Sequence, residues 1–208
     1  MRPTARVPLV LLLAPLLLTA CGTERKAGAP AAPASRAELA SRSKPLGIAP
    51  EHVYAIEAPP GFVLARQSVG VFGGDGFSAA YVDSGSGGGR ITLTVDRGTM
   101  TAANCPTLPA ASSGEPAACE RDGDAWYRVS GARREYAVPK EGHVLRLAAE
   151  GDVPRDALRE AALGAHRPGG DELDALLPET PAATGPLERG DLPPAGDGAP
   201  DNSVGAGG

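Results

Sequence analysis

Hydrophobic and polar residues alternate with a period of two through much of the middle of the chain, which predicts β-strands. The clearest example is residues 90–96, where Ile91, Leu93 and Val95 alternate with polar side chains. Residues 77–83 alternate in the same way. A glycine-rich stretch separates the two segments, and glycine adopts the positive φ angles of tight turns at little cost. We therefore predict that the two segments form a β-hairpin.

Further strands are predicted on both sides of this hairpin from the same alternation. Their ranges are 62–67, 125–130, 134–138 and 143–149. Residues 69–72 either continue the first of these strands or pair beside it. Residues 53–57 also alternate, ahead of a Pro-Pro-Gly turn. Residues 99–120 show no period, so we predict no regular element there.

After residue 150 the apolar period changes from two to 3.6. One apolar stripe is formed by Leu158, Ala161, Ala162 and Ala165, at the spacing i, i+3, i+4, i+7. This pattern predicts an amphipathic helix that begins at Val153-Pro154, with Asp152 as its N-cap. A second short helix is expected over residues 171–177.

Together these elements predict an α+β fold, a small antiparallel sheet of hairpins with a C-terminal helix packed on it. We expect one folded domain over residues 51–178. All the aromatic residues of the chain, one Trp, four Tyr and three Phe, lie in this range and supply large buried areas. Residues 21–50 and 179–208 consist mostly of small and polar residues and proline, so we predict a flexible linker and a disordered tail.

The chain begins with Arg2 and Arg6 ahead of an apolar stretch over residues 7–18. This stretch is shorter than the roughly 20 residues that cross a bilayer as a helix. The layout therefore favours a secretory signal peptide over a transmembrane anchor. An ordinary signal peptide cut elsewhere is the alternative, and it would leave Cys21 as a free thiol.

Leu18-Thr19-Ala20-Cys21 resembles the lipobox of bacterial membrane lipoproteins, in which an aliphatic residue and two small residues precede a cysteine. The resemblance implies that residues 1–20 are removed and that Cys21 carries a diacylglycerol. Two acyl chains give the stable anchoring that one chain does not. We therefore expect the protein on the extracytoplasmic face of the cell membrane. Its 28 glycines and 21 prolines, with abundant alanine, are typical of a high-GC genome and point to an actinobacterial source.

The order of elements also resembles small exported domains of anti-sigma-like and lipoprotein families. Pro60-Gly61-Phe62 and the order strand, strand, helix over residues 125–165 carry this resemblance, and no function is transferred from it. The chain has 20 Lys and Arg against 25 Asp and Glu, a net charge of −5. Such an acidic chain is a poor candidate for binding nucleic acid, which needs clustered basic residues.

Cys105 and Cys119 flank a segment without large apolar residues. In an exported protein, where disulfides persist, we predict a structural bond between them, worth about 3 kcal/mol for a loop of roughly 15 residues. A redox pair or a pair of metal ligands is the alternative. Redox chemistry favours a Cys-x-x-Cys spacing, and no histidine or second cysteine pair lies nearby.

Other motifs give weaker signals. Gly74-x-Gly76-x-x-Ala79 matches a dinucleotide fingerprint, and Gly76-Phe77-Ser78-Ala79-Ala80 resembles a nucleophile elbow, but both motifs require a helix where a strand is predicted. Glu120, Asp122 and Asp124 lack the spacing of a calcium loop, so they are interpreted as a polar turn. Trp126 and Tyr127 point to opposite faces of a strand, so we expect one to be buried and the other available to a ligand.

Two classes of function remain. We expect a lipid-anchored binding or interaction module of the cell envelope that attaches to the membrane through Cys21 and contacts an envelope protein or another ligand. No catalytic residue, cofactor or metal site is predicted for it. The alternative is an exported hydrolase that uses Ser78 with a histidine, which requires a histidine nitrogen within hydrogen-bond reach of the Ser78 Oγ.

Overall fold

A computed structural model of the chain describes residues 32–85, 87–108 and 116–179. The strands are β1 (Phe62–Phe72), β2 (Gly76–Asp83), β3 (Arg90–Arg97), β4 (Ala118–Asp122), β5 (Ala125–Ser130), β6 (Arg133–Lys140) and β7 (His143–Glu150). The helices are α1 (Arg36–Ser43), α2 (Arg155–Leu163) and α3 (Asp171–Leu176), with two short 3-10 helices, η1 (Lys44–Leu46) and η2 (Pro50–His52).

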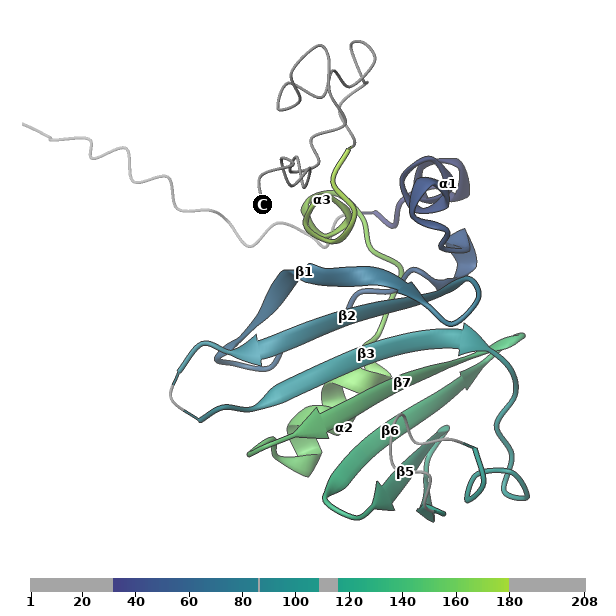
Figure 1. Cartoon of the computed structure of the whole chain (residues 1–208), viewed down its shortest axis with the longest axis vertical. Helices are drawn as coiled ribbons and strands as arrows, with labels where there is room; N and C mark the ends of the chain where they lie inside the picture. Colours follow the sequence, from purple (N-terminus) through teal and green to yellow (C-terminus); the bar gives the residue numbers. More distant parts are fainter. Residues whose placement is uncertain (1–31, 86, 109–115, 180–208) are drawn as a thin grey trace, which may run out of the picture. The chain divides into compact units, whose positions relative to one another are not determined.

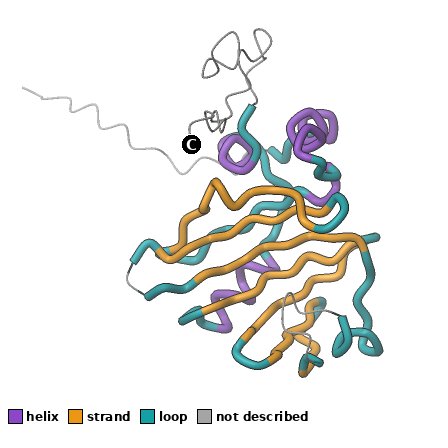
Figure 2. The backbone as a smooth tube through the Cα atoms, viewed as in Figure 1, coloured by secondary structure: helices purple, strands orange, loops and turns teal. Residues whose placement is uncertain are grey.

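The seven strands form one antiparallel sheet in the order β1-β2-β3-β7-β6-β5-β4 (Figure 1). Short helices pack on it, which confirms the predicted α+β class (Figure 2). Helix α2 contacts β6 and β7, and α3 contacts β1. None of the helices in the described ranges has the length and apolar character needed to cross a membrane.

The predicted 77–96 hairpin is confirmed in both strands, and its register places Ala79 opposite Leu93 and Tyr81 opposite Ile91. These side chains define the inner face of the sheet, which the helices cover. The inner face holds the main core, to which β7 adds Leu145 and Leu147. The opposite face, which we call the outer face, carries Thr92, Thr94 and Asp96 of β3, and the residues that pair with them on the neighbouring strands lie on the same face.

Both predicted helices are present, with two corrections. Leu158, Ala161 and Ala162 are buried as the stripe predicts, and α3 buries Leu173 and Leu176. Ala165, the fourth member of the predicted stripe, lies beyond the end of α2 and is half-buried. The predicted cap at Asp152 is wrong, because α2 begins at Arg155 with Pro154 at the N-cap position and no side-chain capping bond.

The predicted domain boundary at residue 51 is too late. Residues 32–50, assigned to the linker, form α1 and η1, where Leu39, Ser43 and Ile48 are buried. Ser35 caps α1 by accepting from the Glu38 N–H, and the Ala34 N–H bonds the Pro168 carbonyl. A helix this short gains its stability from this packing rather than from its own propensity.

Two further segments differ from expectation. Residues 53–57 do not form a strand: their only sheet-like pairing is an isolated bridge between Ala55 and His166. Conversely, β4 begins inside the segment 99–120 that was predicted to lack regular structure and extends two residues past it. It pairs with β5 through residues of mixed polarity, including Glu120 opposite Tyr127, so alternation gave no signal.

Candidate functional site

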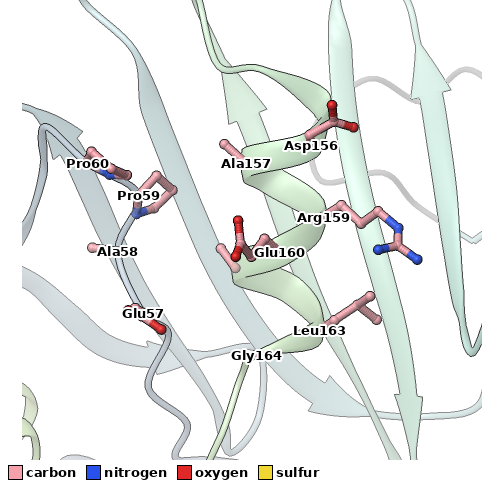
Figure 3. A pocket seen from close by; sticks show the side chains of 11 residues that line it. Glu57, Ala58, Pro59, Pro60, Asp156, Ala157, Arg159, Glu160, Leu163 and Gly164 are labelled. Atoms are coloured by element: carbon pink, nitrogen blue, oxygen red, sulfur yellow. The ribbon is translucent and has the colours of Figure 1, made fainter.

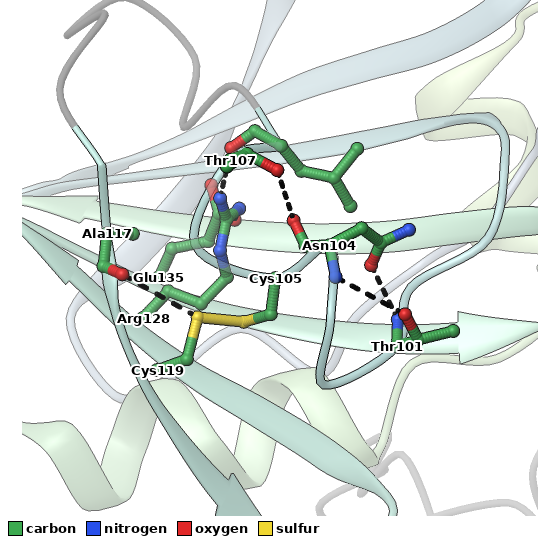
Figure 4. The surroundings of a disulfide bond; sticks show 9 residues. Thr101, Asn104, Cys105, Thr107, Ala117, Cys119, Arg128 and Glu135 are labelled. Carbon is green, nitrogen blue, oxygen red and sulfur yellow. Dashed lines mark hydrogen bonds and ion pairs between the residues drawn. A yellow bond between two sulfur atoms is a disulfide. The ribbon is translucent and has the colours of Figure 1, made fainter.

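The predicted disulfide is present: Cys105 and Cys119 are bonded, with Cα atoms 6.3 Å apart (Figure 4). It fixes the segment between β3 and β4 over the outer face. That segment also carries its own polar bonds, because the Thr101 N–H donates to the Asn104 Oδ1 at 2.7 Å. Met100 and Cys105 join Trp126, Ala137 and Val144 in a second, smaller apolar cluster.

A buried ion pair lies under this loop. Arg128 of β5 and Glu135 of β6 are paired, and they are only 1% and 2% exposed. The same guanidinium donates to the Leu108 carbonyl. Alternation predicts that both side chains face solvent, because it cannot show that a loop covers the outer face.

The aromatic pair is not available to a ligand. Trp126 lies on the outer face in the cluster beneath the loop, and Tyr127 lies on the inner face, and both are buried. The expectation that one of them is exposed is therefore wrong. Each is also covered by a guanidinium: Arg121 lies 5.0 Å from the Trp126 ring centroid and Arg155 lies 3.9 Å from that of Tyr127.

The acidic residues near the turn at Gly123 fasten α2 to the sheet. The Asp122 carboxylate accepts from the Arg159 guanidinium at 2.9 Å and from the Tyr136 hydroxyl at 2.8 Å, and both bonds hold its pKa below the usual range. Arg155 donates to Glu120 at 2.7 Å. Nowhere in the described part of the chain do three or more His, Cys, Asp or Glu residues gather as metal ligands would.

Ser78 lies on the outer face of β2, because its neighbours Phe77 and Ala79 are buried in the inner core. His143 lies on the inner side with Leu145, since Val144 between them joins the outer cluster. Within the described ranges no histidine nitrogen is bonded to the Ser78 Oγ. The glycine at position 76 has a structural role, since a Cβ there would lie 2.5 Å from the Val95 carbonyl oxygen.

A groove of about 830 Å³ runs between residues 57–60 and α2 (Figure 3). Ala157 and Glu160 of α2 face it from one side, and Pro59 faces it from the other. It is open and lacks a buried polar group directed into it, so it has no feature that selects a ligand.

A second pocket, of about 420 Å³, has a different character. It lies where the end of β3 and the turn between β6 and β7 meet the segment after η2. We call it the histidine pocket, and define it by His52, Tyr54, Lys140, His143 and Arg167. Both histidine rings are buried, and their centroids are 5.5 Å apart in an edge-to-face arrangement.

Hydrogen bonds fix the tautomer of His143. Its Nδ1 lies 2.9 Å from the Glu141 carbonyl oxygen, which can only accept, so Nδ1 carries the proton. The Nε2 atom is then the acceptor for the Tyr54 hydroxyl at 3.1 Å. Burial lowers the pKa of His143, and the nearby His52, Arg167 and Lys140 lower it further. The ring is therefore held neutral.

His52 is oriented in the same way but leaves one nitrogen unbonded. Its Nδ1 donates to the Asp75 carbonyl oxygen at 2.9 Å, so its Nε2 bears the lone pair. Asp75 is itself held by Arg97, whose Nε lies 3.0 Å from each carboxylate oxygen. No bond to the His52 Nε2 occurs among residues 32–85, 87–108 and 116–179. The His52 ring, which is only 1% exposed, thus lines the pocket with one acceptor that has no described partner.

Arg167 forms part of the wall through its contact with Tyr54. Its guanidinium carbon lies 4.2 Å from the Tyr54 ring centroid, and its Nη1 donates to the carbonyls of Val53 and Pro50 at 2.9 and 3.2 Å. Neither Arg167 nor Lys140 forms an ion pair with any described carboxylate. These two cations are therefore available to a ligand.

The sequence gives no sign of this pocket. His52 and His143 lie far apart in the chain and follow no spacing motif. They meet because β3, which pairs with β7, and the turn before β2 bring their hydrogen-bond partners to one end of the sheet. His166, in contrast, bonds Glu172 at 3.0 Å and belongs to the helical layer.

The predicted lipidation site, Cys21, lies outside the described residues. Comparisons of the chain with protein-family models, with curated proteins and with solved structures found no match.

Proposed function

We propose that this chain is a lipid-anchored binding module on the extracytoplasmic face of a bacterial cell membrane, and that the histidine pocket is its recognition site. The observation that carries the proposal is the His52 ring, which lines the pocket, has its Nδ1 bonded to the Asp75 carbonyl and has an Nε2 without a hydrogen-bond partner among the described residues. Such an acceptor, beside two cations that pair with no described carboxylate, can receive a hydrogen bond from a ligand.

The location follows from two features. The Cys105–Cys119 bond fits an oxidising compartment, where disulfides persist. Leu18-Thr19-Ala20-Cys21 supports anchoring through a diacylglycerol at Cys21. The proposal contains no chemical step, since Ser78 and the buried histidines lie on opposite faces of the sheet.

The anchor is tested by Cys21→Ala. This change should abolish lipid labelling and move the protein out of the membrane fraction. A variant that is still recovered with membranes after a high-salt wash contradicts the anchor.

The recognition site is tested by photo-crosslinking in intact cells. A photoreactive residue at Glu141, on the exposed turn beside the pocket, should give a discrete adduct with an envelope component. The matched control is Val63, which is 51% exposed on the outer face of β1 and should give none. Equal adducts at both positions, or none at either, contradict the pocket as the recognition site.

A further inference from the structure

We propose that the histidine pocket binds a phosphate group that shares one proton with the Nε2 of His52. This inference rests on the proposed function, because it names the ligand chemistry of the same site. It follows from three features of the pocket: two cations without carboxylate partners, one fixed acceptor, and the arrangement of the surrounding carboxylates.

The cations provide the attraction. Arg167 is held flat against Tyr54 and uses its Nη1 for two backbone carbonyls, which leaves its Nε and Nη2 without a bond among the described residues. Lys140 is the last residue of β6 and lines the pocket beside the turn at Glu141. A guanidinium with two free donors and an ammonium suit the several oxygens of an oxyanion.

The fixed acceptor selects among oxyanions. Because the Nδ1 of His52 donates to the Asp75 carbonyl, the neutral ring can only accept through Nε2. A ligand that meets it must bring an O–H, which sulfate and carboxylates lack near neutral pH. Phosphates titrate near pH 6–7, so a phosphate readily keeps one proton.

The acidic residues of the pocket are only partly neutralised. Asp75 is paired with Arg97, and Glu51 lies 3.9 Å from the Arg36 guanidinium. Glu141 has no such partner among the described residues and opposes an anion at the exposed turn. Lys140 and Glu141 therefore form a matched pair of adjacent positions, whose neutralisation should change phosphate affinity in opposite directions.

The experiment titrates the mature full chain, in nonionic detergent, with inorganic phosphate, sulfate and acetate at pH 7. Binding is followed through the imidazole nitrogen resonances of His52. Phosphate should shift the His52 Nε2 resonance and bind about tenfold more tightly than sulfate, the factor expected from one charge-assisted hydrogen bond. Sulfate or acetate binding as tightly as phosphate would overturn the proposal.

Single substitutions test the His52 acceptor and the charges at positions 140 and 141 separately. His52→Gln should remove the preference for phosphate over sulfate, whereas Lys140→Gln should weaken phosphate binding severalfold and Glu141→Gln should strengthen it. Lys140 and Glu141 are exposed, so these two variants fold even where a change at Arg167 disturbs Tyr54. A preference that persists in His52→Gln, or equal affinities of Lys140→Gln and Glu141→Gln, contradicts the assignment.

The phosphate can come from a lipid headgroup or from a soluble compound, and vesicles distinguish the two. Phosphatidic acid carries a monoester that can hold a proton, whereas the diester of phosphatidylglycerol cannot. Competition by phosphatidic acid vesicles identifies a headgroup, and competition by soluble monoesters alone identifies a soluble ligand.

Adducts at Glu141 without phosphate selectivity overturn this inference but keep the binding module. Selective phosphate binding without envelope adducts overturns the module but keeps the inference.

Discussion

The inner and outer faces of the sheet are covered by different kinds of structure. On the inner face, α1, α2 and α3 contribute leucines and alanines to a continuous apolar core. On the outer face, residues 98–108 pack over β5, β6 and β7 without forming a helix or strand, and they are held by the disulfide and by the bond from Arg128, the partner of Glu135, to the Leu108 carbonyl. The inner layer thus depends on apolar area, whereas the outer layer depends on a few specific bonds. Four predictions test this difference.

The largest effect is expected from Glu135→Gln on the outer face. The change leaves Arg128 buried without its carboxylate, which should lower the free energy of unfolding by about 3–5 kcal/mol. Urea unfolding measures the loss. The double variant Arg128→Met with Glu135→Leu should recover most of it, because no buried charge remains. A single variant within 1 kcal/mol of the wild type contradicts the importance of the pair.

On the inner face, Leu147→Ala should lower the free energy of unfolding by about 2–5 kcal/mol through lost burial and a residual cavity. The effect should be global, with amide exchange accelerated in β1 to β3 as well as in β7. The control Val63→Ala, at an exposed position, should change stability by less than about 0.5 kcal/mol. Accelerated exchange confined to β7 is inconsistent with one continuous core.

Removing the disulfide with Cys105→Ala and Cys119→Ala should cost about 3 kcal/mol. Protease cleavage should increase between Thr99 and Ala117 and stay unchanged in the hairpin of β2 and β3. Membrane attachment should not change, because we expect it to depend on Cys21. In the wild-type protein, thiol counting after denaturation without reductant should find neither Cys105 nor Cys119 free, and two free thiols there reopen a redox or metal role.

The smallest effect concerns pH. Burial holds the pKa of His143 below its unfolded value of about 6.5, so the unfolded chain binds more protons below that pH. The stability from neutral His143 is therefore complete above pH 6.5 and declines as the pH falls toward the folded pKa. Thermal unfolding between pH 7 and 5 should show this decline, and His143→Gln should flatten it. If the stability of His143→Gln declines with falling pH as steeply as that of the wild type, a group other than His143 takes up the proton.

The sequence specified the inner face better than the outer face. Ile91, Leu93 and Val95 alternate cleanly because one side of β3 is covered by helices and the other is not. On β5 the pattern fails, because Trp126 and Arg128 are buried under a loop that has no periodicity of its own. The disulfide was predictable, since Cys105 and Cys119 are 14 positions apart and their chemistry in an oxidising compartment leaves few alternatives.

The histidine pocket could not be predicted from the sequence because its parts are set by tertiary register. The His52 ring is held by the backbone carbonyl of Asp75, and the His143 ring by that of Glu141. Every residue type supplies a backbone carbonyl, so the sequence does not reveal these bonds. The sequence around Arg167 also gives no sign of its aromatic partner. Its stacking on Tyr54 depends on where the chain passes after α2.

The strand order also has a consequence for how the chain folds. Every pair of neighbouring strands is also consecutive in sequence, except β3 and β7. The chain therefore contains two local meanders that close through short turns, joined by one pairing across a long stretch of chain. Since long-range pairing is the slow part of folding, we expect the two meanders to form first and the junction between β3 and β7 to form last.

That junction ends at Arg97 opposite His143, beside the histidine pocket. The pocket therefore assembles only when the slowest pairing is complete. A ligand bound in the pocket is therefore expected to stabilise the strand pairing that forms last.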